Sequence, residues 1–141
     1  MCRAHAAVRQ LVGGMLQEED IVAVVDMEAG LEHLSRGTGR HVDTLVVMME
    51  PYYRALETAR RTVELGRELG VARVAVVSNK VRDELDRQTV AGFAASHGLE
   101  ILGEIPFDDE LRRGDQRRLA PLDTNAAAIG SLEKLVDLLL N

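Results

Sequence analysis

The sequence predicts an α/β fold in which helices cover both faces of an open, parallel sheet. Short, continuous apolar runs recur along the 141 residues, and such runs are typical of strands that are buried on both sides. Helical periodicity fills the stretches between these runs. An order of strand, helix, strand gives right-handed crossovers, so the sheet is expected to be parallel.

Four strands are expected, and each ends at polar or turn-forming residues. They cover residues 21–25, 44–49, 74–77 and 100–105. The residues that follow them are Asp26, Glu50-Pro51, Ser78-Asn79-Lys80 and Pro106.

Helices are expected where apolar residues recur every three or four positions. One precedes the first strand, two cover residues 54–69 and 86–97 and are closed by Gly70 and Gly98, and one forms the C-terminus. Asp123 or Thr124 is expected to cap the C-terminal helix. The apolar positions are Val8, Leu11, Val12, Met15 and Leu16; Leu56, Ala59 and Val63; Val90, Phe93 and Ala94; and Ile129, Leu132, Val136 and Leu139.

Composition narrows the possible classes of protein. A length of 141 residues fits a single domain spanning 1–141, and a net charge of −6 argues against a dedicated nucleic-acid binder. No apolar run approaches the ~20 residues that span a bilayer, and no secretory signal follows Met1. Cys2 is the single cysteine, which excludes an internal disulfide. A cytoplasmic location is therefore expected.

The candidate site lies at the carboxyl ends of the strands, where open parallel sheets bind their ligands. Asp26 with Gly30 has the D-x-x-x-G spacing of a nucleotide switch, in which the carboxylate holds a Mg²⁺-bound water and the glycine approaches a γ-phosphate. The alternative for Asp26 is a helix cap. Asn79 offers a donor and an acceptor to a purine edge, next to Lys80. The alternative there is a turn with a solvated lysine.

Two further groups have alternative interpretations. The turn of Pro106, Phe107 and Asp108 presents backbone groups to a base, or Asp108 simply caps a helix, and both can hold together. Cys2 and His5 have C-x-x-H spacing, which supplies two of the four ligands of a tetrahedral metal site. Such a pair completes a site only across a dimer, and the alternative is an unligated terminus. The sequence contains no GxxxxGK[ST] phosphate-binding loop.

Several segments together resemble one family. The string VVDMEAGLEHL at residues 24–34 resembles the switch region of the carbon monoxide dehydrogenase accessory ATPases, which insert nickel and belong to the MinD and nitrogenase-iron-protein group of dimeric P-loop ATPases. Residues 45–58, SNKV at 78–81 and GEIPFD at 103–108 resemble the segments that follow in that family. The similarity covers nearly the whole chain and indicates the C-terminal part of a Rossmann-like P-loop fold.

The resemblance implies a function and a set of ligands. It implies ATP or ADP with Mg²⁺, a homodimer, and a client enzyme like carbon monoxide dehydrogenase, with Ni²⁺ or Zn²⁺ bridging two subunits through a C-x-C motif whose second cysteine matches Cys2. It assigns the switch to Asp26 and Gly30 and adenine recognition to Asn79, beside Lys80, and to the 106–108 turn. Because the family's Walker A loop is absent, hydrolysis by these residues alone is not expected, and a truncated product or a misassigned start codon is the preferred explanation.

The missing part has a structural consequence. In the family, the P-loop strand lies between the strands that correspond here to residues 21–26 and 44–49. Without it, two strand edges lose backbone hydrogen bonds worth about 0.5–1.5 kcal/mol each, so we expect the two strands to pair directly or a partner to fill the gap.

Two other functions remain as alternatives. One is an interaction or pseudoenzyme domain that keeps the fold without binding nucleotide. The other is a receiver-like signalling module, which matches poorly because Glu50 replaces the central Asp and Lys80 follows the third strand instead of the last.

Overall fold

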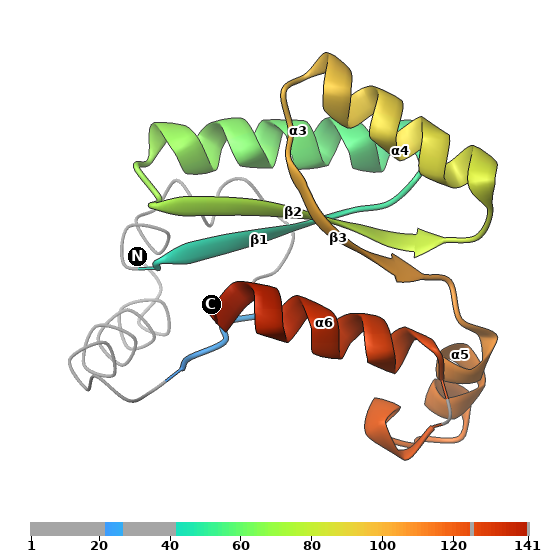
Figure 1. Cartoon of the computed structure of the whole chain (residues 1–141). Helices are drawn as coiled ribbons and strands as arrows, with labels where there is room; N and C mark the ends of the chain where they lie inside the picture. The colour runs from blue at the N-terminus through green and yellow to red at the C-terminus, as the bar shows by residue number, and fades with distance from the viewer. Residues whose placement is uncertain (1–21, 27–41, 125, 141) are drawn as a thin grey trace, which may run out of the picture.

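The computed structural model describes residues 22–26, 42–124 and 126–140. In chain order the elements alternate between strand and helix before two helices close the chain (Figure 1). They are β1 (Thr44–Met49), α3 (Tyr53–Glu68), β2 (Arg73–Val81), α4 (Glu84–Ser96), β3 (Ile101–Pro106), α5 (Asp109–Gln116), a short 3₁₀ helix η3 (Pro121–Asp123) and α6 (Ala128–Leu140).

The sheet is parallel and open, with the strands in the order β1-β2-β3. Val47 of β1 lies opposite Val76 of β2, and Val76 lies opposite Ile101 of β3. Helices α3 and α4 cover one face, and α6 covers the other (Figure 1). The connections from β1 to β2 and from β2 to β3 both lead to the next strand on the same side. Because both are right-handed, their helices lie on the same face of the sheet. The predicted fold class is confirmed.

The expected strand at residues 21–25 is wrong for the part that the structure describes. Val22–Asp26 is irregular and exposed, with Val22 and Val24 showing 70% and 91% of their surface to solvent. A strand needs a neighbour to satisfy its backbone groups, and among the described residues β1 pairs with β2 alone. The direct pairing that we expected between this run and β1 is therefore not formed. A partner filling the gap stays a prediction.

Most other boundaries agree with the sequence to within two residues. Strand β1 and helices α3 and α4 lie where the periodicity places them, and Gly70 adopts a positive φ of 76° after α3, as expected for a C-terminal glycine. Strand β2 is longer than expected, because pairing with β3 continues it to Val81. Helix α5 begins directly after Asp108, where a helix cap was one of the two interpretations. The expected N-terminal helix lies outside the described residues.

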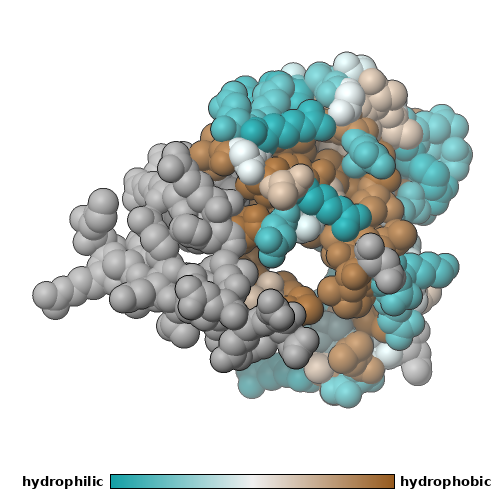
Figure 2. Space-filling model, turned by 60° about the vertical axis from the view of Figure 1, so that its left-hand side comes forward, coloured by the Kyte–Doolittle hydropathy of each residue, from teal (hydrophilic) through white to brown (hydrophobic). Residues whose placement is uncertain are grey.

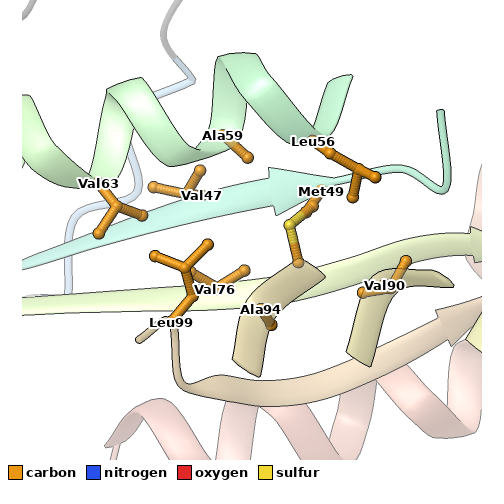
Figure 3. Packing of buried hydrophobic residues seen from close by; sticks show 9 residues of the cluster. All are labelled: Val47, Met49, Leu56, Ala59, Val63, Val76, Val90, Ala94 and Leu99. Carbon is orange, nitrogen blue, oxygen red and sulfur yellow. The ribbon is translucent and has the colours of Figure 1, made fainter. Parts of the chain in front are cut away.

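The larger core lies between the sheet and helices α3 and α4 (Figure 3). Each element contributes the apolar face that its periodicity predicted. Gly66 allows α3 to approach the sheet closely, since a Cβ there would lie 2.8 Å from Leu45 Cδ2. The buried residues are Val47, Met49, Leu56, Ala59, Val63, Val76, Val90, Ala94 and Leu99.

A smaller core lies between the sheet and α6. It joins Val77, Ile105, Ala128 and Leu135. Gly103 lets α6 come close, because a Cβ at this position would lie 2.5 Å from Leu135 Cδ2. Substituting a larger residue here would push α6 away from β3.

The C-terminal end of α6 lies beside the start of β2. Arg73 donates a hydrogen bond of 2.9 Å from Nη2 to the carbonyl of Leu138. Cationic donors at this end satisfy carbonyls that the helix leaves unpaired. The contact joins the C-terminal end of α6 to the end of the sheet at which β2 begins.

Apolar side chains remain exposed at the β1 side of the molecule. Val46 and Met48 of β1 are exposed, although Ala75 and Val77, their neighbours on β2, are buried on the same face. Figure 2 shows a face of the molecule on which apolar residues gather. Helix α6 also exposes apolar residues, namely Leu132, Val136, Leu138 and Leu140. Within the described ranges, no helix is long and apolar enough to cross a membrane.

Two neighbouring methionines test the core. Met49 is 0% exposed and Met48 is 45% exposed, so Met49→Ala leaves a cavity whereas Met48→Ala does not. We expect Met49→Ala to lower the free energy of unfolding by about 2–5 kcal/mol, and Met48→Ala to change it by less than about 1 kcal/mol. Urea denaturation followed by circular dichroism measures both. Equal losses would contradict this assignment of the two faces of β1.

Candidate nucleotide-binding rim

Three strand ends meet at one edge of the sheet, which we call the rim: Glu50 and Tyr52 after β1, Asn79 to Arg82 at the end of β2, and Pro106 to Asp108 at the end of β3. Parallel pairing brings these ends together, since Asn79 lies opposite Ile105 and Val81 opposite Pro106. The N–H of Phe107 donates to the carbonyl of Val81 over 2.9 Å. The expected gathering of Asn79, Lys80 and the 106–108 turn is therefore found.

The end of β2 has an irregular backbone that sequence reasoning did not foresee. Asn79 and Lys80 belong to the strand instead of following it, and the pairing with β3 shifts between Asn79 and Val81. Lys80 has a φ of 58°, a left-handed conformation that is uncommon outside glycine. The shift changes the direction of the strand at its last residues. It leaves Asn79 half-buried, Lys80 exposed and Val81 buried.

The carboxamide of Asn79 makes no side-chain hydrogen bond within the described part of the chain. Ser78 beside it does, donating to the carbonyl of Gly103 over 3.3 Å. A half-buried amide with an unused donor and acceptor can bind a ligand that presents both. This is the property that the sequence reasoning required of Asn79.

Lys80 is held by a neighbouring strand end. Its Nζ lies 2.7 Å from Glu50 Oε1, in an ion pair that is open to solvent. Such pairs contribute about 0–1 kcal/mol to stability. The pair joins the ends of β1 and β2, and it partly neutralises the lysine that the sequence reasoning assigned to the cofactor.

Arg82, Phe107 and Tyr52 form a second link across the rim. The guanidinium of Arg82 lies over the Phe107 ring, 4.4 Å from its centre, and Nη1 donates to the hydroxyl of Tyr52 over 3.3 Å. The sequence reasoning missed Arg82 and Tyr52. A basic residue three positions after Asn79 was the available signal, but only the pairing of β2 with β3 shows that it meets Phe107.

Asp108 caps two helices at once. Its Oδ1 accepts the N–H of Glu110 at the start of α5 over 2.8 Å, and its Oδ2 accepts the N–H of Ala128 at the start of α6 over 3.2 Å. The Ala128 N–H and then the other backbone donors hold the pKa of Asp108 below its usual value. The capping role expected for Asp108 is confirmed, whereas its contact with a base stays a prediction.

The expected caps of the C-terminal helix are wrong. Asp123 lies within η3, Thr124 follows it, and α6 starts only at Ala128. Asp108, which is distant in sequence, supplies the cap in their place. Tertiary structure brings it there, so local spacing could not identify it.

Asp26 does not share the rim with the other candidates. It is exposed and follows no strand. Figure 1 draws the segment 22–26 near the end of α6, on the side of the molecule where the strands begin. Its expected position at a strand end is therefore wrong, for the reason that its strand has no partner. Gly30 and Cys2 lie outside the described residues, so the switch and the metal ligand stay predictions.

Comparison with known proteins supports the resemblance. No protein-family model matches the chain. The carbon monoxide dehydrogenase accessory protein CooC of Rhodospirillum rubrum is 35% identical in an alignment of 142 positions that covers 99% of this chain and 52% of that protein. An ATP-binding protein of Methanocaldococcus jannaschii is 32% identical over 141 residues, which are 99% of this chain and 54% of that protein.

Over nearly its whole length the chain is thus similar to CooC and to an ATP-binding protein. It spans about half the length of the curated relatives that it matches, which fits their C-terminal part. The MinD cell division protein of Aquifex aeolicus shares the fold, with a TM-score of 0.62 at 18% identity over 73% of this chain and 46% of that one. Among the described residues, no group of three or more His, Cys, Asp or Glu could hold a metal ion.

The double cap predicts a pH-dependent loss of stability. We expect Asp108→Ala to lower the free energy of unfolding by about 1–2 kcal/mol near neutral pH, because the N–H groups at the starts of two helices lose their acceptor. The folded state lowers the pKa of Asp108, so this stabilisation is present above the unfolded pKa of about 3.9 and is lost as the pH falls through the folded value.

The free energies of unfolding of the wild type and Asp108→Ala should therefore approach each other as the pH falls from 6 to about 3. Urea denaturation at each pH measures both. Asp109→Ala is the matched control, since within the described residues Asp109 makes an exposed ion pair with Arg112 and accepts no helix-start N–H. A difference that stayed constant with pH would mean that the charge of Asp108 does not contribute.

Proposed function

We propose that this chain is the adenine-recognising part of an ATP-binding accessory protein. The observation that carries the proposal is the carboxamide of Asn79, which has no hydrogen-bond partner among the described residues and stands at the end of β2 beside the 106–108 turn. The relatives that match 99% of the chain include proteins described as ATP-binding. A carboxamide suits adenine because it pairs an acceptor with the exocyclic amine and a donor with the neighbouring ring nitrogen.

Discrimination against guanine follows from the same geometry. Guanine presents an acceptor and a donor in the opposite places, so a fixed carboxamide leaves at least one group unpaired. A site that hydrogen-bonds one partner rejects an analogue that cannot complete the bonds. In this proposal Pro106 and Phe107 fix the turn beside the base, and Lys80, paired with Glu50, lines the same rim.

The phosphate side of the site is only partly represented. In this proposal Gly30, which is outside the described residues, lies against the γ-phosphate when nucleotide is bound. Asp26 lies away from the rim and is given no role at Mg²⁺. The sequence contains no Walker A loop to surround the β- and γ-phosphates. We therefore propose nucleotide binding without hydrolysis by these 141 residues alone.

We further propose that the protein acts in metal insertion. The support is the 35% identity with a protein named as an accessory to carbon monoxide dehydrogenase. In this proposal the cargo is Ni²⁺, the client is an enzyme of that type, and two copies of the chain share the ion through Cys2. Zn²⁺ would bind the same thiolates.

An interaction domain without nucleotide remains the second candidate. The observation that favours it is the exposed position of Asp26, away from the rim. In that case the sheet and its helices serve as a folded support for contacts with another protein.

Calorimetric titration separates these two functions. We expect ATP and ADP to bind the wild type, and Asn79→Ala to weaken both by about tenfold, because one or two hydrogen bonds to the base are lost. Gln88→Ala on α4 is the control, since the contact that Gln88 makes within the described part of the chain is an exposed one with Glu84. Absence of nucleotide binding to the wild type would support the interaction domain instead.

A metal-binding test addresses the cargo. We expect the wild type to bind Ni²⁺ at about one ion per two chains and to dimerise with it, because a tetrahedral site takes four ligands and Cys2 of two copies supplies two of them. Cys2→Ser should abolish both, while His97→Ala should leave them unchanged. Equilibrium dialysis and analytical ultracentrifugation measure the two effects. Ni²⁺-induced dimers of the Cys2→Ser variant would refute the shared site.

A further inference from the structure

We propose that Arg82 forms the stacking surface of the base site, so that a purine lies against the guanidinium face opposite Phe107. This inference rests on the proposed nucleotide function and adds a residue to it. It names an interaction with the face of the base, whereas Asn79 is proposed to recognise its edge.

The position of Arg82 is fixed by contacts with all three strand ends. Phe107 supports the guanidinium from one side at 4.4 Å, and the Tyr52 hydroxyl accepts a hydrogen bond from Nη1. The Phe107 backbone is itself bonded to Val81, the residue before Arg82. A long, flexible side chain is thereby held in one orientation, which reduces the entropy that ligand binding would otherwise cost.

The outer face and the charge of Arg82 remain available. Arg82 is exposed, and within the described residues its guanidinium forms no salt bridge. The nearest acidic contact is made by its backbone, whose N–H donates to Asp86 Oδ2 over 3.0 Å. Lys80, the other cation of the rim, is already paired with Glu50. Of these two cations at the rim, Arg82 is therefore the one whose planar group can contact a ligand.

Stacking suits this arrangement better than binding a phosphate. A phosphate is bound by the edge of a guanidinium through two parallel hydrogen bonds, and one edge nitrogen of Arg82 already donates to Tyr52. The free face, in contrast, can accept any π system, as arginine does on aromatic rings and bases. Arg82 directly follows β2 and is three residues after Asn79, with the shift in pairing at Lys80 between them, so both residues stand at the same end of the strand.

The two residues are therefore expected to have separable effects. Stacking depends little on which base is present, so Arg82 contributes affinity. Hydrogen bonding to the edge depends on the base, so Asn79 contributes the preference for adenosine. A residue with a purely structural role would change stability without producing this division.

Titration with nucleosides tests the inference without phosphate contacts. Adenosine and guanosine are added to ¹⁵N-labelled protein, and dissociation constants are obtained from chemical-shift changes. Arg82→Gln should weaken both nucleosides by about three- to tenfold, as expected for a lost cation–π contact. Asn79→Ala should instead reduce the preference for adenosine. Arg61→Gln, an exposed position on α3, makes the same change of charge away from the rim and should have no effect.

Two milder variants protect the test against unfolding. Arg82→Lys keeps the charge but loses the plane, and should bind nearly as weakly as Arg82→Gln. Tyr52→Phe removes only the hydroxyl that orients Arg82, and should weaken nucleosides about twofold. Thermal unfolding of each variant shows whether the fold is retained.

The outcomes distinguish this inference from the proposed function. If the wild type binds no adenosine, both are overturned. If Asn79→Ala weakens adenosine but Arg82→Gln and Tyr52→Phe do not, only the role of Arg82 is overturned. If Arg82→Gln weakens tripolyphosphate but not adenosine, Arg82 is a phosphate ligand and the stacking surface is refuted.

Discussion

The structure depends on the parallel pairing of β2 with a strand on each side. Ala75 to Ser78 are buried in succession, because helices cover both faces of the central strand. The same pairing brings the ends of β1 and β3 to either side of Asn79 and Lys80. Every candidate contact of the rim therefore follows from the register of three strands, and a shift by one residue would turn Asn79 to the other face.

The rim is tied to the body of the protein by polar contacts that cross from one element to another. Asp108 joins the turn after β3 to the start of α6, and the Glu50–Lys80 pair joins β1 to β2. Arg87 adds a two-pronged contact with Glu104, which holds α4 against β3. These contacts orient side chains at the place where the proposed function needs a fixed geometry.

The outer edge of β1 differs from the rim, because it is apolar and has no neighbouring strand among the described residues. β1 has one hydrogen-bonded neighbour among the described residues, and Val46 and Met48 beside that edge are exposed. An apolar strand edge of this kind is a surface on which further chain can pair. The relatives are nearly twice as long as the segment that matches this chain. The exposed, irregular run Val22–Asp26 shows that an apolar segment does not form a strand without a neighbour to pair with.

The sequence by itself determined the fold class, three of its strands, the helices that follow β1 and β2, and the family, because hydrophobic periodicity and short motifs are local. It also identified the cap at Asp108. Only the tertiary structure decided that Asp26 lies away from the rim, that Asp108 and not Asp123 or Thr124 caps α6, and that Arg82 rests on Phe107. These depend on which strands find partners and how close distant segments come, and neither is encoded in the spacing of neighbouring residues.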